Sequence, residues 1–222
     1  MKVIRVWDLP LRLFHWSLAI LVAGAIGIEK IGGDALAWHF RAGYAILALL
    51  VFRVFWGTFG TRYARFSSFL FAPSAIFTYA TGRAGGKNYL GHNPIGSLSV
   101  FALLAALLMQ VISGLFSNDD IASEGPWVKF ISKDLSDQAT WLHAQVGSTV
   151  IYALLGLHVA AILYHVFWKK DNLVKAMITG DKPVALDAAH AAADADDSIR
   201  TRLIAAVALL AATAAVYFLV TF

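Results

Sequence analysis

The chain has no cysteine among its 222 residues. This absence excludes disulfide bonds, iron–sulfur clusters held by thiolates, the Cys-x-x-Cys-His motif that attaches c-type haem, and cysteine-based zinc sites. Any metal that this chain binds must therefore be held by histidine, carboxylate or thioether groups.

Charged residues are also scarce. They make up 14% of the chain, whereas hydrophobic residues make up 59% and the mean hydropathy is +0.67. Soluble domains carry about 25% charged and about 45–50% apolar residues. The composition therefore excludes an ordinary soluble domain and, with its long apolar runs, predicts an all-α integral membrane protein.

The few charges are mostly positive, with a net charge of +4 and a pI near 9.4. A basic chain can bind nucleic acid, but in a membrane protein Lys and Arg residues act as orientation signals. We therefore expect a lipid bilayer around the chain and no nucleic acid as a partner.

Long apolar runs predict five transmembrane helices. The first four form a core over 1–180, and a polar cytoplasmic linker over 181–202 joins it to the fifth. Because further spans follow the first apolar run and no clear small-residue cleavage site does, that run is expected to remain as a helix. Aromatic and small residues over 66–79 are expected to lie along the membrane interface or dip into it. The predicted helices are 13–28, 38–59, 95–116, 139–168 and 203–222.

The Lys and Arg residues divide unevenly between the two sides of this bundle. With the N-terminus inside, thirteen lie in inner segments and four in outer loops, while Arg53 falls inside the second helix. Cytoplasmic segments carry an excess of Lys and Arg. We therefore expect a multi-pass membrane protein with a cytoplasmic N-terminus and with its C-terminus on the opposite side.

Histidines occur at two depths of the predicted bundle. His39 and His143 lie near the outer side, and His15 and His158 lie towards the inner side. The fifteen residues from His143 to His158 span about 22 Å of helix. Ionisable groups in a bilayer face the bundle interior, and a haem iron takes two axial imidazoles on opposite faces. The pattern predicts one haem between His39 and His143 and another between His15 and His158.

Two other interpretations of the histidines remain open. Each histidine taken alone could make an interhelical hydrogen bond. His165 follows His158 by seven residues on nearly the same helix face, which makes it a rival inner ligand.

Arginines in the second helix could serve the same cofactor. Arg53 and Arg41 are candidates to bind haem propionates, which accept bidentate hydrogen bonds. Arg53 could instead extend to the inner headgroups. His92 and His190 are expected to be solvated surface residues.

Four segments together resemble a known family. They are VWDLPLRLFHW at 6–16, WHFRAGYAILALLVFRVFWGTFG at 38–60, HNPIGSLSVFALLAALLMQVISGLF at 92–116 and LHVAAILYHVFWKKDNLVKAMITG at 157–180. The chain resembles the bacterial di-haem cytochromes b of the prokaryotic cytochrome b-561 and nickel–iron hydrogenase b-subunit group. The resemblance implies a four-helix transmembrane bundle with two b haems in a bacterial inner membrane, which makes the outer side, and with it the C-terminus, periplasmic. It places the ligands on His15, His39, His143 and His158.

The chain departs from this family's pattern in two places. Its two helix-four histidines stand one residue further apart than in relatives, so we expect a bulge or a tilt that adjusts their phase. A final helix over 203–222 follows the four-helix core and has no assigned role.

The leading hypothesis is an electron carrier without catalytic residues, as the resemblance implies. It would link membrane quinone to a periplasmic redox protein, either a hydrogenase subunit or a c-type cytochrome, and the 61–93 segment is a candidate neighbour of the quinone. One alternative is a haem-dependent membrane oxidoreductase such as a superoxide:quinone oxidoreductase. Another is a transporter with structural histidines, which the lack of an inverted repeat in the sequence disfavours.

Overall fold

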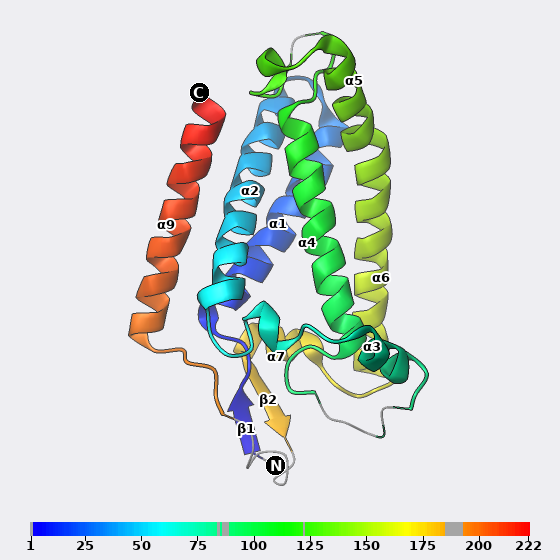
Figure 1. Cartoon of the computed structure of the whole chain (residues 1–222), viewed down its shortest axis with the longest axis vertical. Helices are drawn as coiled ribbons and strands as arrows, with labels where there is room; N and C mark the ends of the chain where they lie inside the picture. The colour runs from blue at the N-terminus through cyan, green and yellow to red at the C-terminus, as the bar shows by residue number, and fades with distance from the viewer. Residues whose placement is uncertain (1, 84, 86–88, 122, 185–192) are drawn as a thin grey trace. The chain divides into compact units, whose positions relative to one another are not determined.

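The computed structural model describes residues 2–83, 85, 89–121, 123–184 and 193–222. Its regular structure is almost entirely helical (Figure 1). The long helices are α1 (Leu9–Ile31), α2 (Leu36–Phe59), α4 (Pro94–Leu115), α6 (Ser148–Phe167) and α9 (Ile199–Thr221). The shorter elements are β1 (Lys2–Arg5), α3 (Pro73–Ala80), α5 (Lys133–Trp141), α7 (Leu173–Thr179) and β2 (Asp181–Val184), with 3-10 turns at Gly33–Ala35, Phe66–Ser68 and Val128–Phe130 and a π-helical turn at Leu142–Gly147.

Five helical stretches within the described residues are long and apolar enough to cross a membrane. The predicted helical membrane fold is therefore confirmed. In the fourth stretch, α5, the π-helical turn and α6 follow one another without a break. The stretches are Leu9–Ile31, Gly33–Phe59, Pro94–Leu115, Lys133–Phe167 and Ile199–Thr221.

The first helix begins at Leu9, earlier than the predicted start at residue 13, because Asp8 caps it. The carboxylate of Asp8 accepts a hydrogen bond from the N–H of Leu11 at 2.7 Å. Pro10 suits the first turn of a helix, where its missing N–H costs nothing. A capping acid and a proline thus extend the helix beyond the apolar run that predicted it.

The chain forms two compact units, neither of which is a continuous stretch of sequence. Unit 1 comprises Met1–Leu13, Val54–Ala102 and Gly156–Ala206. Unit 2 comprises Phe14–Arg53, Leu103–Leu155 and Val207–Phe222. The division into a core, a linker and a C-terminal helix along the sequence stays a prediction.

The core of unit 2 is apolar and draws on five helices. α9 belongs to it, and its end is fastened by the indole Nε1 of Trp127, which donates to the carbonyl of Leu219 at 2.9 Å. Within unit 2, α9 therefore packs against the other helices. The buried cluster comprises Val22, Ile46, Leu47, Ala48, Leu50, Ala106, Leu107, Val111, Leu115, Ile151 and Val216.

In unit 1, a two-stranded antiparallel sheet joins the N-terminal residues to the segment after α7. Figure 1 shows β1 and β2 side by side. Arg5 pairs with Asp181, and the N–H groups of Val6 and Trp7 donate to the carbonyl of Gly180 at 2.8 and 3.0 Å. Neither strand was predicted, because four-residue strands so far apart in the sequence carry no periodic signal.

Asp197 ties β1, α1 and α9 together within unit 1. Its carboxylate accepts hydrogen bonds from the N–H of Leu9 at 3.1 Å, from Arg5 at 2.6 Å and from Arg202 at 3.1 Å. Burial alone would raise the pKa of Asp197, but these hydrogen bonds outweigh it and hold the pKa below its ordinary value. Asp197 therefore stays ionised in this network.

Part of the predicted linker over 181–202 is consequently ordered. β2 lies at its start, and the N–H of Ala195 donates to the carbonyl of Arg5 at 2.7 Å. Residues 185–192, which include His190, lie outside the described part of the chain.

The segment after α2 holds a cluster of phenylalanines. The ring of Phe66 lies 5.5 Å from that of Phe101, measured between centroids. The same ring occupies the place that a Cβ would take at Gly57, so the close approach requires glycine there. The 66–79 segment thus forms a 3-10 turn and α3, and its position at a membrane interface stays a prediction.

Candidate functional site

Two of the predicted ligands come close together in unit 2. The rings of His39 and His143 have centroids 6.0 Å apart, and their planes make an angle of 84°. His39 lies in the first turn of α2, and His143 lies in the π-helical turn between α5 and α6. The pair therefore joins two membrane-spanning stretches that are far apart in the sequence.

Each ring of this pair is oriented by a backbone carbonyl. Nδ1 of His39 lies 3.0 Å from the carbonyl oxygen of Ala25, and Nδ1 of His143 lies 2.8 Å from that of Gln110. Because a carbonyl oxygen only accepts, Nδ1 carries the proton in both rings and Nε2 keeps its lone pair. Histidines that bind metals are commonly held in this way.

The π-helical turn positions His143 against α4. Gln110 donates from its side-chain nitrogen to the carbonyl of His143 at 3.0 Å. Glycines allow this approach: a Cβ at Gly114 would lie 2.9 Å from Cε1 of His143, and one at Gly147 would overlap the side-chain oxygen of Gln110. A π turn holds one residue more than an α turn. The turn is therefore a bulge, which is one of the two adjustments, a bulge or a tilt, that we expected from the wide spacing between His143 and His158.

This arrangement fits a haem. Two imidazole nitrogens bound to opposite sides of one iron, with bonds of about 2 Å, place the ring centroids roughly 6 Å apart. Among the residues that the structure describes, no group of three or more His, Cys, Asp or Glu side chains could hold a metal ion. His39 and His143 would therefore suit a metal that arrives in a prosthetic group such as haem, which would supply the remaining ligands.

The predicted inner ligands lie in different units. His15 is in unit 2, where its ring meets that of Trp16 edge-on at 5.1 Å, and His158 is half-buried in unit 1. The pairing of His15 with His158 stays a prediction. So does the alternative ligand His165, whose buried Nδ1 has no hydrogen-bond partner among the described residues.

The two candidate arginines differ in burial. Arg53 is only 2% exposed, and its guanidinium carbon lies 5.9 Å from the centre of the Phe14 ring. This burial disfavours a side chain that extends to the headgroups. Arg41 is exposed and stacks over the ring of Trp38 at 4.5 Å. Their contact with haem propionates stays a prediction.

His92 is not a solvated surface residue, and that expectation is wrong. Its ring packs against those of Trp7 and Phe69, with centroids 4.8 and 4.5 Å away, and its Nδ1 is buried. The neighbouring Asn93 explains this position, since its side chain caps α4 by accepting the N–H of Gly96 at 2.7 Å. A histidine directly before a helix cap is held at the helix start, and this was the signal available in the sequence.

Asp8 is a buried carboxylate that no sequence pattern singled out. It is 0% exposed and accepts hydrogen bonds from the indole Nε1 of Trp56 at 3.3 Å, from the hydroxyl of Thr61 and from the N–H of Leu11. Burial is the largest influence on Asp8 and raises its pKa, while the hydrogen bonds oppose this. Within unit 1, Asp8 joins the start of α1 to the end of α2. An acid directly before an apolar run was the only sequence signal for it.

A helical membrane protein that brings two carbonyl-oriented histidines together from different spans has the features of a membrane b-type cytochrome. The chain belongs to the prokaryotic cytochrome b561 family, whose profile matches residues 6–180. It is therefore a multi-pass membrane protein that carries haem b and transfers electrons.

Curated relatives share most of the chain's length. The chain is 24% identical over 213 residues to a probable Ni/Fe-hydrogenase B-type cytochrome subunit of Azotobacter vinelandii, which covers 80% of this chain and 87% of the relative. It is 26% identical over 214 residues to a protein of the same name from Cupriavidus necator, with coverages of 81% and 86%. A third such protein, from Rhizobium leguminosarum bv. viciae, is 24% identical over 215 residues, with coverages of 81% and 88%. No solved structure matches the chain.

Proposed function

We propose that this chain holds two b haems and carries electrons across a bacterial inner membrane between the quinone pool and a periplasmic redox partner. His39 and His143 hold the outer haem, and His15 and His158 hold the inner one. The observation that carries the proposal is the outer pair, with ring centroids 6.0 Å apart and both Nδ1 atoms against backbone carbonyls.

The protein's own groups have defined tasks in this proposal. Haem b supplies an iron that cycles between the ferrous and ferric states. The carbonyls of Ala25 and Gln110 fix the tautomer of each outer imidazole and make it a more basic ligand. Arg53 and Arg41 are assigned to the propionates, and the burial of Arg53 supports this role.

Two haems suit the thickness of the membrane. A bilayer has a hydrocarbon core of about 30 Å, and the fifteen residues from His143 to His158 span about 22 Å of helix. Electrons can therefore cross in shorter steps through two levels than through one. This spacing supports a second haem at the level of His15 and His158.

The proposed orientation places the N-terminus in the cytoplasm and the C-terminus in the periplasm. The excess of Lys and Arg in the inner segments supports it. The pairing of β1 with β2 supports a single side for residues 2–5 and 181–184, with the C-terminus one span further, on the other side.

A periplasmic hydrogenase subunit is the preferred partner, and a c-type cytochrome is the second. The names of the relatives support the hydrogenase. An acidic concavity in unit 2, which includes Asp119, Asp120 and Glu124 among its lining residues, is a candidate place for a basic partner surface. The quinone is assigned to the 61–93 segment, where His92 offers a hydrogen-bonding group among aromatic rings.

A reduced-minus-oxidised spectrum with a measured haem stoichiometry tests this proposal. We expect b-type bands and two haems per chain. His39→Ala and His143→Ala should each leave one haem, and it should be the same one. Loss of different haems in these two variants would overturn the pairing, and absence of b-type bands in the unaltered protein would overturn the function.

Matched histidine variants serve as controls. His92→Ala should keep both haems, because its ring packs among aromatic side chains. His165→Ala should also keep both. If His165→Ala loses the inner haem and His158→Ala does not, then His165 is the inner ligand.

A further inference from the structure

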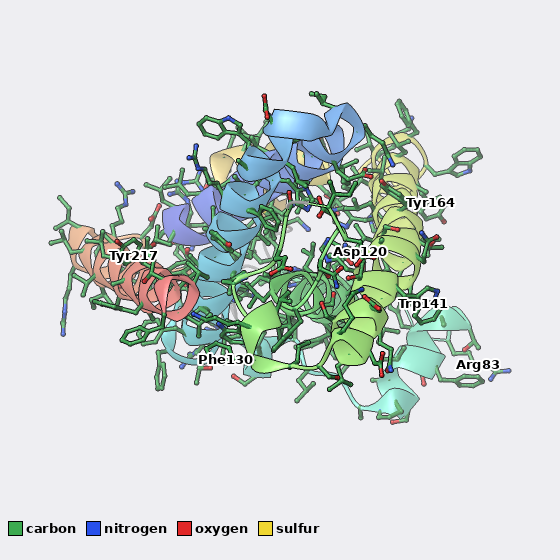
Figure 2. The ribbon with its side chains drawn as sticks, turned by 90° about the horizontal axis from the view of Figure 1, so that it is seen from above. Arg83, Asp120, Phe130, Trp141, Tyr164 and Tyr217 are labelled. Atoms are coloured by element: carbon green, nitrogen blue, oxygen red, sulfur yellow. The ribbon has the colours of Figure 1, made fainter. Side chains whose placement is uncertain are left out.

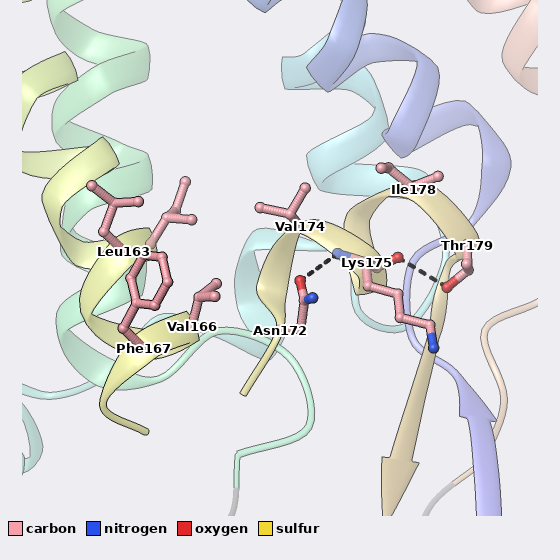
Figure 3. A pocket seen from close by; sticks show the side chains of 9 residues that line it. Leu163, Val166, Phe167, Asn172, Val174, Lys175, Ile178 and Thr179 are labelled. Carbon is pink, nitrogen blue, oxygen red and sulfur yellow. Dashed lines mark hydrogen bonds between the residues drawn. The ribbon is translucent and has the colours of Figure 1, made fainter. Parts of the chain in front are cut away.

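An open groove lies in unit 1 between the C-terminal end of α6 and α7. It has a volume of about 490 Å³. Figure 3 shows the α6 side chains on one side of it and the α7 side chains on the other. Its lining residues are Ile162, Leu163, Val166, Phe167, Asn172, Val174, Lys175, Ile178 and Thr179.

The walls of the groove are apolar and face outward. Phe167 of α6 is 63% exposed and Ile178 of α7 is 58% exposed. The other face of α7 holds the helix in place. Ala176 on that face is buried, and the carbonyl of Gly180, just after the helix, accepts a hydrogen bond from the N–H of Val6, the residue that follows β1. The α7 wall of the groove is therefore held from behind and presents apolar side chains outward.

Lysines lie in the groove and in the segment next to it. Lys175 contributes to its lining, and the segment that joins its two walls carries the exposed residues Lys169 and Lys170. The one acid in that segment, Asp171, has its own partner in Lys182 at 3.5 Å. Lys169, Lys170 and Lys175 themselves form no ion pair among the described residues.

Aromatic side chains indicate the depth of this region in the membrane. The rings of Tyr164 and Trp168 stack with centroids 6.4 Å apart and an angle of 20°. Tyr164 lies on the outward side of α6 (Figure 2), and Trp168 is exposed. Exposed tyrosine and tryptophan at the end of a spanning helix mark the headgroup level. The groove therefore lies where acyl chains meet headgroups.

We propose that this groove binds an anionic phospholipid. One acyl chain lies along the apolar walls, and the phosphate lies against Lys175 with Lys169 and Lys170 beside it. Basic pockets at the cytoplasmic ends of membrane helices bind anionic lipid headgroups. A neutral quinone would use the apolar walls but not the lysines, so the charge of the site favours the lipid.

Lipid titration of the delipidated, haem-loaded full chain, followed by native mass spectrometry, tests the proposal. Phosphatidylglycerol should bind more tightly than phosphatidylcholine. Changing Lys169, Lys170 and Lys175 to Gln should weaken phosphatidylglycerol binding by about fivefold per lysine and leave phosphatidylcholine binding unchanged. Equal binding of the two lipids by the unaltered protein would overturn the proposal.

A matched variant controls for general loss of positive charge. Arg62, Arg65 and Arg83 also lie in unit 1 and are exposed, and Arg83 extends outward beyond the end of α3 (Figure 2). Changing these three to Gln should alter phosphatidylglycerol binding by less than the lysine variant does. If both triple variants lose the same affinity, the lipid is attracted by net charge and the groove is not the site.

A second variant tests the apolar walls. Ile178→Trp should fill the groove and weaken both lipids, whereas Leu98→Trp, at another exposed apolar position of unit 1, should weaken neither. Unchanged haem spectra would show that the variants are folded. If a short-chain quinone displaces the lipid and the lysine variant binds that quinone normally, the occupant is the quinone and the proposal is wrong.

Discussion

The two units of the molecule hold their polar side chains in different ways. In unit 2, His39 and His143 are oriented by backbone carbonyls. In unit 1, Asp197 binds two arginines and a backbone N–H, and Asp8 binds side chains of α2 and of the loop after it. Carbonyl contacts do not titrate, whereas carboxylate contacts change with pH and salt. The orientation of the two histidine rings should therefore depend less on salt than the carboxylate contacts of unit 1 do.

The largest expected effect comes from Asp197→Ala. It removes the acceptor of three hydrogen bonds, and we expect a loss of about 2 kcal/mol of stability after allowing for the exposure of the arginines. Thermal unfolding in detergent, followed by circular dichroism, measures this loss. Asp34→Ala, at an exposed turn, should cost far less. If Asp197→Ala also removes the proposed outer haem, the two units do not respond separately.

Gly114→Ala disturbs the histidine pair of unit 2 and leaves the carboxylates of unit 1 in place. The added Cβ would lie 2.9 Å from Cε1 and 3.0 Å from Nδ1 of His143, so the ring must move. We expect about tenfold weaker haem retention, as for other losses of support around a ligand. Haem stoichiometry after dilution or dialysis measures it. Gly24→Ala, also in unit 2, has nothing within 4 Å of the added carbon and should retain haem normally.

The two carboxylates of unit 1 should respond to pH in opposite directions. The pKa of Asp197 is lowered, so its stabilisation is present above the ordinary value of 3.8 and is lost as pH falls through the lowered pKa. The pKa of Asp8 is raised by burial, so its contribution is full below 3.8 and is lost as pH rises through the raised pKa.

Asp8→Asn should therefore flatten the fall in stability that occurs as the pH rises above 3.8. The measurement is the unfolding temperature as a function of pH in detergent, compared between the variant and the unaltered protein. Parallel curves for the two proteins would contradict the raised pKa of Asp8.

The smallest expected effect concerns α9. Trp127→Phe removes the hydrogen bond from the indole Nε1 to the carbonyl of Leu219 and keeps most of the ring. We expect a loss of about 1 kcal/mol or less and an unchanged haem spectrum. Thermal unfolding measures the first, and a reduced-minus-oxidised spectrum measures the second. A changed spectrum would mean that α9 supports the histidine pair directly.

Apolar runs were sufficient to predict the five spans, because a bilayer imposes one length and one composition on every crossing. Counting residues along two such helices was enough to predict that His39 and His143 share one level of the bundle. The carbonyl partners of their rings did not, because any helix presents carbonyls at every depth and only packing selects Ala25 and Gln110.

Outside the spans, the sequence was less informative. β1 and β2 depend on contacts between residues more than 170 positions apart, and neither has an alternating pattern. Asp8 looked like an ordinary acid before a helix, since nothing in its local sequence reveals Trp56 and Thr61 as partners. The wide spacing from His143 to His158 did suggest a bulge, and the π-helical turn is its physical form.

The pairing of β1 with β2 also has a consequence for biogenesis. β1 is synthesised first, but its partner strand emerges only after four spans have been made. If one of those spans failed to insert, β2 would be left on the opposite side of the bilayer and the sheet could not form. The small sheet therefore forms only when residues 2–5 and 181–184 lie on the same side of the bilayer, which links the N-terminal strand to the insertion of the four spans between them.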